Sequence, residues 1–358
     1  MNTTVAPGAL RIALLGAGTV GAAVARAIAG RAGEWPLAIA GIAVRDIEKA
    51  RAAGLDRIAP LTVDARGLAQ SDVDVVVELM GGIDPALACV ESALLAGRPV
   101  VTANKLLLAT HGAHLEATAR NAGASLRFES AVAAGVPVIS VLAKDLAANE
   151  VSLIRGIVNG TTNYILTKME SEGWTYDRAL GEAQKIGYAE ADPRSDVEGE
   201  DAAAKLVVLA RMAAGSWPSL AHVALDAAPG ITGVTPEAIA AAAGRNERLR
   251  LLAVWENGGD DPARDILSVR VTAVPADAGF GRTVGGGNHI VISGDLIGDL
   301  TLAGAGAGPG STASGVIADL LAIARGEGSS WGDLPQAFDA PPPARVRSPM
   351  RSPLMTMW

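Results

Sequence analysis

The clearest candidates for chemistry in this sequence are a carboxylate and an ammonium one helical turn apart, Asp201 and Lys205. They open the segment 202–214, in which Lys205 and Arg211 are the only charged residues. A helix that is apolar around its whole circumference is normally buried, and burying a charge is costly unless it is paired or used. The simple alternative is an exposed ion pair worth about 0.2–0.5 kcal/mol. The apolar surroundings favour a catalytic lysine with Asp201 as its partner.

The loop before that helix carries three carboxylates, Glu190, Asp192 and Asp196. A solvated acidic turn is the simple alternative for such a cluster. A substrate that carries an ammonium group, however, needs groups that only accept hydrogen bonds, and carboxylates supply them. We therefore treat this loop as a candidate substrate-recognition segment.

A G-x-G-x-x-G motif lies at residues 16–21, directly after an apolar strand-like segment and at the start of a helical one. That context is typical of a dinucleotide-binding loop rather than of a chance glycine cluster, which is the alternative in a chain with 42 glycines. The glycines permit a tight turn, close approach to the pyrophosphate and close packing of the helix, and the helix N-terminus attracts phosphate. The motif predicts a cofactor loop made of Gly16, Ala17, Gly18, Thr19, Val20 and Gly21.

The choice of nucleotide depends on the end of the second expected strand, where Arg45 precedes Asp46. An acidic residue there binds the ribose diol of NAD, whereas an arginine can bind a 2′-phosphate with two hydrogen bonds. We favour NADP because Arg45 comes first, and Asp46 keeps NAD as an alternative. The simple interpretation of Arg45 is a solvated strand end.

The elements that must position these residues alternate between strands and helices in the first part of the chain. Such alternation predicts an α/β fold with a Rossmann-type, doubly wound parallel sheet. Ligands bind at the carboxyl edge of such a sheet. The expected strands are 10–15, 37–44, 74–79, 99–102 and 125–129, with helices at 20–29 and 86–95.

After about residue 149 the pattern changes to that of an α+β domain with its own sheet. A glycine-rich break at 304–310 precedes a last helix at 312–324, and the proline-containing tail from 340 is expected to be loosely ordered or wrapped on the surface. The expected strands are 151–158, 266–274 and 288–292, and the expected helices are 161–170, 176–185 and 202–214.

Composition limits the classes of partner. The chain has 358 residues and a formal net charge of −8, which argues against nucleic acid and anionic membrane surfaces as partners. No segment is apolar enough for a membrane span, and the N-terminus lacks the pattern of a signal peptide. We expect a cytoplasmic enzyme with a small-molecule substrate.

Seven short stretches, in order and spacing, resemble the homoserine dehydrogenase family over residues 10–325. That family reduces L-aspartate 4-semialdehyde to L-homoserine with a nicotinamide cofactor, in the branch leading to threonine and methionine. The stretches are GAGTVG (16–21), ELMGGIDPA (78–86), TANK (102–105), ESAVAAGVPVI (129–139), GIVNGTTNYIL (156–166), GYAEADPRSDVEGEDAAAK (187–205) and GAGAGPGSTASGVIADL (304–320).

The resemblance implies a role for each matching residue. Lys205 matches the catalytic lysine, and Asp201 matches the carboxylate that orients it and the substrate. The residues that match the substrate pocket are Gly160, Thr161, Glu190 and Asp196, and those that match the cofactor and reacting centre are Thr102 and Lys105. An aldehyde that accepts a hydride gathers negative charge on its oxygen, which a positioned ammonium can stabilise and then protonate.

The resemblance also implies features that the residues alone do not suggest. Gly308 matches a position on the nicotinamide side, so the last helix should pack on the first domain. The resulting domains are 1–148 plus about 305–358 for the dinucleotide, and 149–304 for substrate, catalysis and dimerisation, with a homodimer expected. A monovalent cation, sodium in the family, would be held by Glu129 and the carbonyl groups of Val132, Ala134 and Val136.

Two departures from the family pattern and two rival functions remain. The family commonly has Pro-Thr-Ala-Ser where this chain has Ser-Thr-Ala-Ser at 311–314, with an extra Pro309-Gly310 ahead of it. The chain also ends without the regulatory domain of many relatives, so feedback inhibition through such a domain is not expected. A sugar- or inositol-type oxidoreductase would explain Lys105 but not residues 187–205. A catalytically idle cofactor-binding sensor has no need for Asp201, Lys205 and Lys105 together.

Overall fold

The computed structural model describes residues 8–225, 230–259 and 261–337. These residues form two compact units. The first unit contains the described residues up to Ala147 together with Ala307–Ala337, and the second unit is Ala148–Gly306. The predicted behaviour of the tail from residue 340 concerns residues outside the described part. No helix among the described residues is long and apolar enough to cross a membrane.

The first unit is built on a parallel sheet with the strand order β3-β2-β1-β4-β5-β6. This order reverses at β1 and β4, which is the arrangement of dinucleotide-binding folds, and it confirms the predicted doubly wound sheet. The strands are β1 (Leu10–Leu15), β2 (Leu37–Ala43), β3 (Leu61–Thr62), β4 (Val75–Glu78), β5 (Val100–Thr102) and β6 (Leu126–Arg127).

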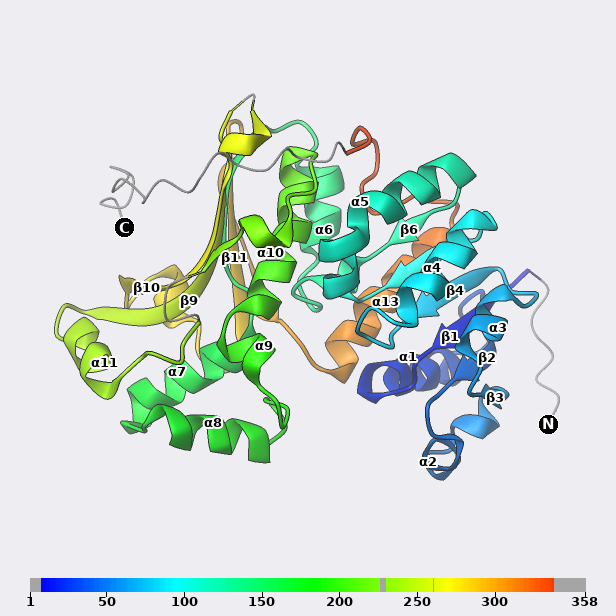
Figure 1. Cartoon of the computed structure of the whole chain (residues 1–358), viewed down its shortest axis with the longest axis horizontal. Coiled ribbons are helices and arrows are strands. Elements are labelled where there is room, and N and C mark those ends of the chain that lie inside the picture. The colour runs from blue at the N-terminus through cyan, green and yellow to red at the C-terminus, as the bar shows by residue number, and fades with distance from the viewer. Residues whose placement is uncertain (1–7, 226–229, 260, 338–358) are drawn as a thin grey trace. The chain divides into compact units, whose positions relative to one another are not determined.

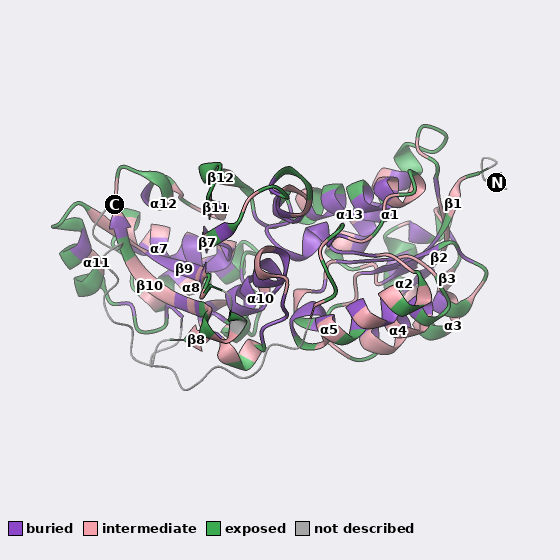
Figure 2. Ribbon diagram, turned by 90° about the horizontal axis from the view of Figure 1, so that it is seen from above, coloured by how far each residue is buried: buried purple, intermediate pink, exposed green. Residues whose placement is uncertain are grey.

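Helices cover both faces of this sheet. The main ones are α1 (Thr19–Gly30), α3 (Ala65–Gln70), α4 (Ala86–Leu95), α5 (Lys105–Ala122) and α13 (Pro309–Ala324), and the short ones are α2 (Ile47–Ala52) and α6 (Val138–Ser140). Helices α1 and α13 pack together on one face, and α3, α4 and α5 lie on the other (Figures 1 and 2).

Helix α5 was not predicted, although Asn104 caps its N-terminus by accepting a hydrogen bond from the Leu107 N–H. Its buried face is built largely from small or polar residues such as Gly112 and Thr118. Such a face gives little apolar periodicity for a sequence-based prediction.

The second unit contains a mixed sheet with the order β12-β11-β7-β9-β10-β8, antiparallel except for the short β8. Its strands are β7 (Val151–Ile157), β8 (Ala224–Leu225), β9 (Glu247–Glu256), β10 (Ile266–Pro275), β11 (Gly287–Gly294) and β12 (Gly298–Ala305), and its helices are α7 (Gly160–Glu172), α8 (Tyr176–Lys185), α9 (Arg194–Val197), α10 (Glu200–Ala214), α11 (Pro236–Ala243) and α12 (Gly279–Arg282).

Three strands of that sheet were not predicted: the two-residue β8 and the longer β9 and β12. Arg248 and Arg250 interrupt the apolar pattern of β9, and the structure pairs both with Glu170. Strand β12 continues to Ala305 and pairs with β11, so the glycine-rich break predicted from residue 304 begins only after the strand. Pairing between strands is a tertiary property that local sequence specifies weakly.

Helix α10 is buried on all sides, as predicted, and packs against β7, β9 and β10 (Figure 2). Even Arg211, in its last turn, has no exposed surface. Because the helix is enclosed, the two charged groups at its start are enclosed with it.

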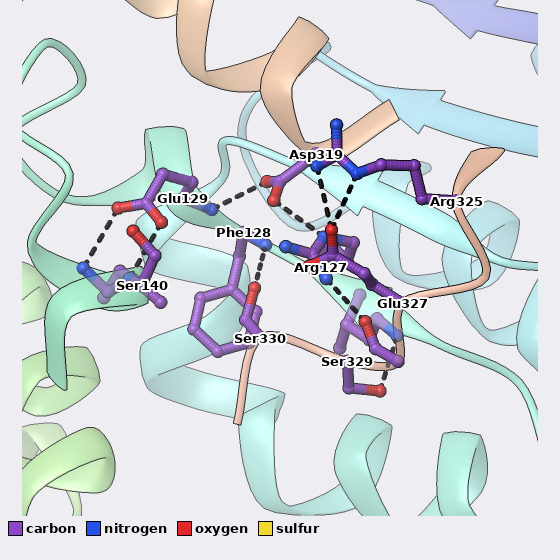
Figure 3. A network of polar contacts seen from close by, with 12 residues as sticks. Arg127, Phe128, Glu129, Ser140, Asp319, Arg325, Glu327, Ser329 and Ser330 are labelled. Carbon is purple, nitrogen blue, oxygen red and sulfur yellow. Dashed lines mark hydrogen bonds and ion pairs between the residues drawn. The ribbon is translucent and has the colours of Figure 1, made fainter. Parts of the chain in front are cut away.

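A buried polar network joins the C-terminal segment of the first unit to the edge strand β6 (Figure 3). Asp319 on α13 accepts hydrogen bonds from Arg127 Nε at 2.8 Å and from the Glu129 N–H at 2.9 Å. Beyond α13, Ser330 donates its N–H to the Leu126 carbonyl at 3.0 Å and accepts the Phe128 N–H at 2.9 Å. The returning segment thereby satisfies hydrogen-bonding groups that an edge strand would otherwise leave open.

We expect Asp319→Ala to lower the free energy of unfolding by about 3–5 kcal/mol, the usual effect of removing one partner from a buried ion pair. The side chains of Arg127 and Asp319 are only 8% and 2% exposed, so the remaining charge would have little water. Denaturant unfolding followed by tryptophan fluorescence measures the change. The control is Arg51→Ala, which breaks an exposed pair with Glu48 and should change stability by less than about 0.5 kcal/mol. Equal stability of the two variants would contradict the structural role of Asp319.

Candidate active site

The Lys205 ammonium lies in a buried polar pocket of the second unit. Its Nζ donates to Asp201 Oδ2 at 2.6 Å and to the Val158 carbonyl oxygen at 2.7 Å. The Lys205 and Asp201 side chains are 11% and 6% exposed, so the alternative of a solvent-exposed ion pair is wrong. A lysine ammonium has three donors, and no third partner for it occurs among the described residues.

Asn159, which was not predicted as a site residue, holds two carboxylates of this pocket together. Its Nδ2 donates to Asp201 Oδ2 at 2.8 Å and to Asp196 Oδ1 at 2.7 Å. Its Oδ1 accepts the Thr162 N–H at 2.8 Å and so caps α7. An asparagine directly before a helix is a known capping signal, and that signal marks Asn159 in the sequence. The second use of its amide depends on tertiary contacts.

The start of α7 is tied to the loop that precedes α10. Thr161 Oγ1 donates to the Tyr188 carbonyl oxygen at 2.8 Å. A Cβ added at Gly160 would lie 2.7 Å from the Gly286 carbonyl oxygen, so only glycine fits there without a shift. Thr161 therefore lies where the 187–193 loop meets the helix that Asn159 caps, and Gly160 lies against the backbone of Gly286.

The structure separates the three carboxylates of that loop. Asp196 is half-buried and bound to Asn159, whereas Glu190 is exposed. Asp192 is exposed and paired with Arg194, and hydrogen bonds from Arg194 lower its pKa to about 2. The solvated-turn interpretation therefore holds for Asp192, and Asp196 is the member that joins the pocket.

The glycine loop of the first unit has the geometry that its motif predicts. Gly16 has φ +94°, and a Cβ there would lie 2.6 Å from the Leu79 carbonyl oxygen. A Cβ at Gly21 would overlap the Gly16 carbonyl oxygen, whereas one at Gly18 would meet nothing. Gly18 begins α1 without a side-chain cap, so the first turn of that helix offers its N–H groups to a phosphate.

Arg45 and Asp46 follow β2, and both are exposed. The Asp46 carboxylate accepts the Lys49 N–H at 2.9 Å and caps α2. That hydrogen bond engages one oxygen of the acidic group that would otherwise bind a ribose diol, and it leaves the Arg45 side chain as the exposed cation beside it.

Thr102 and Lys105 follow one another at the carboxyl end of β5, and Thr102 binds a buried carboxylate, Glu78, that was not predicted as a site residue. Glu78, at the end of β4, accepts Thr102 Oγ1 at 2.6 Å and the Met80 N–H at 2.7 Å. Thr102 in turn accepts the Asn104 N–H at 3.0 Å, and Asn104 caps the helix that Lys105 begins. Glu78 thus ties the end of β4 to the end of β5, which Thr102 closes and from which the chain runs into the helix that begins at Lys105.

Gly308 has φ +118° and begins α13, which packs on α1 within the first unit. A backbone with this φ favours glycine. The Pro309-Gly310 pair, a departure from the family pattern, forms the first turn of α13, where proline is well tolerated.

The residues matched to a cation site form a buried loop of the first unit. The Glu129 carboxylate accepts the N–H groups of Ile139 and Ser140 at 3.0 and 2.9 Å. Burial, and then the charge of Asp319, raise the pKa of Glu129 to about 7. The carbonyl groups of Val132 and Ala134 accept no backbone N–H among the described residues, while Val136 accepts the N–H of Val138 at 2.7 Å. Carbonyl oxygens next to a buried carboxylate are ligands that suit a hard cation.

Comparisons with known proteins identify the family of this chain. A family model described as homoserine dehydrogenase matches residues 137–321, and one described as its NAD-binding domain matches residues 16–129. A homoserine dehydrogenase from Corynebacterium glutamicum is 41% identical over 328 residues, covering 88% of this chain and 72% of the relative. One from Bacillus subtilis is 36% identical over 321 residues, covering 88% and 73%.

Solved structures show the same likeness. A homoserine dehydrogenase from Thiobacillus denitrificans has a TM-score of 0.86 and 34% identity, covering 93% of this chain and 79% of that one. A hyperthermophilic archaeal homoserine dehydrogenase in complex with NADPH has a TM-score of 0.73 and 30% identity, covering 87% and 97%. The chain therefore belongs to the homoserine dehydrogenase family and is an oxidoreductase with an NAD-binding domain.

Proposed function

We propose that Lys205 is the proton donor when this chain reduces L-aspartate 4-semialdehyde to L-homoserine. The observation that carries the proposal is the buried Lys205 ammonium, which has two fixed acceptors and a third donor for a ligand. When bound, the reduced nicotinamide supplies the hydride to the aldehyde carbon. The third N–H of Lys205 stabilises the charge that develops on the carbonyl oxygen and then protonates it, giving the alcohol.

Asp201 keeps that ammonium in place. Its Oδ2 accepts from both Lys205 and Asn159, so the carboxylate cannot turn away without losing two hydrogen bonds. The Val158 carbonyl fixes a second direction of the lysine head group. Such preorganisation lets the donor act without rearranging during the reaction.

The 187–193 loop and α9 supply the carboxylates for the substrate's α-ammonium group. Asp196 lies inside the pocket through Asn159, and Glu190 lies on the loop that Thr161 holds by the Tyr188 carbonyl. We assign Glu190 to the α-ammonium group because it is an exposed carboxylate two residues after Tyr188, whose carbonyl group Thr161 binds. Asp196 is the alternative.

NADP is the preferred nucleotide in this proposal. Arg45 is exposed beside the helix that Asp46 caps, so it is placed to meet a 2′-phosphate, and Lys49 and Arg51 add positive charge nearby. The archaeal relative in complex with NADPH supports this choice.

A monovalent cation, sodium, is the ion that we assign to the Glu129 loop. Glu129, Val132, Ala134 and Val136 would hold it through oxygen atoms, and the ion would supply positive charge next to a carboxylate whose pKa burial raises to about 7. The ion would rigidify the loop between Glu129 and Ile139. At the start of this loop the Glu129 N–H donates to Asp319, and at its end the Ile139 N–H donates to the Glu129 carboxylate.

We also propose a homodimer that acts in the cytoplasm. Helix α10 covers one face of the second sheet, and side chains of the opposite face, such as Val254, Arg270 and Thr272, are half-buried. A self-complementary contact through that face would give the twofold dimer that is commonest among oligomers.

Replacement of the lysine tests the function directly. The wild type should oxidise NADPH with L-aspartate 4-semialdehyde and not oxidise inositol or glucose. Lys205→Ala should lower kcat by about 10²–10⁴-fold, the range for an acid–base group, with NADPH affinity nearly intact. The control is Lys185→Ala, an exposed lysine on α8 that should retain normal turnover. Near-normal turnover in a folded Lys205→Ala protein would exclude Lys205 as the proton donor.

Arg45→Ala should raise the KM for NADPH by roughly 10–100-fold, since it removes charge-assisted hydrogen bonds to the 2′-phosphate. The KM for NADH should change little because NADH lacks that phosphate. Steady-state kinetics with both nucleotides measure the ratio, and Arg57→Ala, at another exposed arginine of the same unit, is the control. Equal changes with both nucleotides would mean that Arg45 does not read the phosphate.

Glu190→Gln should raise the KM for L-aspartate 4-semialdehyde roughly tenfold, about 1.4 kcal/mol, because it removes the charge that faces the substrate ammonium. Cofactor binding should stay unchanged. An aldehyde that lacks the amino group should be a poor substrate for both proteins, and about equally poor. Asp192→Asn is the matched control, since Asp192 is paired with Arg194 outside the pocket. If wild type and Glu190→Gln discriminate equally between the two aldehydes, Asp196 becomes the better assignment.

A further inference from the structure

Asn288 carries a buried side-chain amide that forms no hydrogen bond within the described part of the chain. The residue is 1% exposed, and neither its Oδ1 nor its Nδ2 has a hydrogen-bond partner among the described residues. A buried polar group without a partner is disfavoured by the loss of its hydration. Such a group in a folded protein therefore calls for a functional explanation.

Asn288 lies close to the residue whose carbonyl group binds Lys205, which is Val158 at the end of β7. In the β7–β11 ladder, His289 pairs with Ile157 and Ile290 with Gly156, so Asn288 adjoins Val158. A Cβ built on Gly156 would lie 3.0 Å from a Val158 side-chain carbon and 3.2 Å from one of Ile290. The side chains of Val158 and Ile290 therefore share one face of the sheet.

Asn288 lies on that same face, because residues two apart on a strand point to the same side. The carbonyl group of its neighbour Val158 accepts the Lys205 ammonium. Asn288 thus lies on β11 beside the end of β7, next to the residue whose carbonyl group accepts the Lys205 ammonium.

Backbone packing holds the amide in this position. A Cβ at Gly306 would overlap the Oδ1, Cγ and Nδ2 atoms of Asn288, well inside contact distance. Gly306 follows β12, in which Gly304 is the ladder partner of Asn288. The absence of a side chain at 306 makes the room in which the amide lies.

We propose that Asn288 is a further substrate-binding residue, whose Nδ2 donates a hydrogen bond to the α-carboxylate of the amino-acid substrate. The assignment rests on the proposed function. Glu190 and Asp196 are assigned to the ammonium group of the substrate, whereas the carboxylate group of the substrate requires hydrogen-bond donors. The Asn288 amide is a buried donor without a protein partner among the described residues. The residue binds and orients the substrate and takes no part in the proton transfer.

The test replaces the amide with an apolar group of similar size. Asn288→Leu should weaken L-homoserine binding, measured by calorimetry, and raise the KM for L-aspartate 4-semialdehyde, each by roughly 10–100-fold, as for a hydrogen bond to a charged group. NADPH affinity should be unchanged, and the Tm should be unchanged or higher because a buried unpaired amide is removed. Asn163→Leu is the control for the Tm measurement, since the Asn163 amide donates to the Gly285 carbonyl at 2.9 Å and its loss should lower the Tm.

A double-mutant cycle tests the role of Gly306. Gly306→Ala should displace the amide and weaken L-homoserine binding in the wild-type background. In the Asn288→Ala background the same change should weaken L-homoserine binding little further, because the Asn288 atoms that the new Cβ would overlap are absent. Additive effects of the two changes would overturn the proposed arrangement.

Two further outcomes would overturn the proposal, and a third concerns the function alone. Unchanged L-homoserine binding with a lowered Tm in Asn288→Leu would make the amide structural, and a loss of NADPH affinity instead would assign it to the cofactor. A wild type that fails to reduce L-aspartate 4-semialdehyde would contradict the proposed function. Failure of the Asn288 assignment is seen separately, as normal L-homoserine binding by the variants of an active enzyme.

Discussion

The second unit is organised around one unfavourable burial: a lysine ammonium group is held out of water near the start of a buried helix. Lys205 is tolerated there because Asp201 and the Val158 carbonyl accept two of its hydrogen bonds. Asp201 is in turn held by Asn159, which also caps α7. Removing any of these acceptors would leave a buried charge without compensation, which is far more costly than losing an exposed ion pair. The same contacts therefore stabilise the unit and hold the ammonium group that we propose as the proton donor.

The first unit meets a different constraint, the close approach of backbone to a phosphate group. Positive φ at Gly16 and the contact of Gly21 with the Gly16 carbonyl leave no room for side chains, while Gly18 faces open space. The carboxyl ends of β4 and β5 are fixed by a buried carboxylate, since Glu78 accepts both Thr102 and the Met80 N–H. Here buried polar groups shape the edge of the sheet at which doubly wound folds bind their ligands.

The chain leaves the first unit after Ala147 and re-enters it at Ala307, so the last helix belongs to a core that was begun about 300 residues earlier. Val316 and Leu320 of α13 pack in one cluster with Ile12 and Val75 of the parallel sheet. Asp319 adds a polar link by accepting from Arg127 and from the Glu129 backbone. The loop that we assign to a cation is consequently shaped by residues distant in sequence.

The amino-acid sequence by itself determined the local features whose physics is local. These features are the glycine motif, the apolar runs of the parallel strands, the buried character of α10 and the spacing of Asp201 from Lys205. Each follows from the properties of neighbouring residues. Helix α5 and strands β9 and β12 did not follow, because small residues or arginines hide their patterns until a partner element covers them. The roles of Asn159, Glu78 and Asn288 were likewise decided only by the tertiary structure. Hydrogen bonds join groups across long sequence separations, and whether a polar side chain is satisfied or left unpaired depends on every element packed around it.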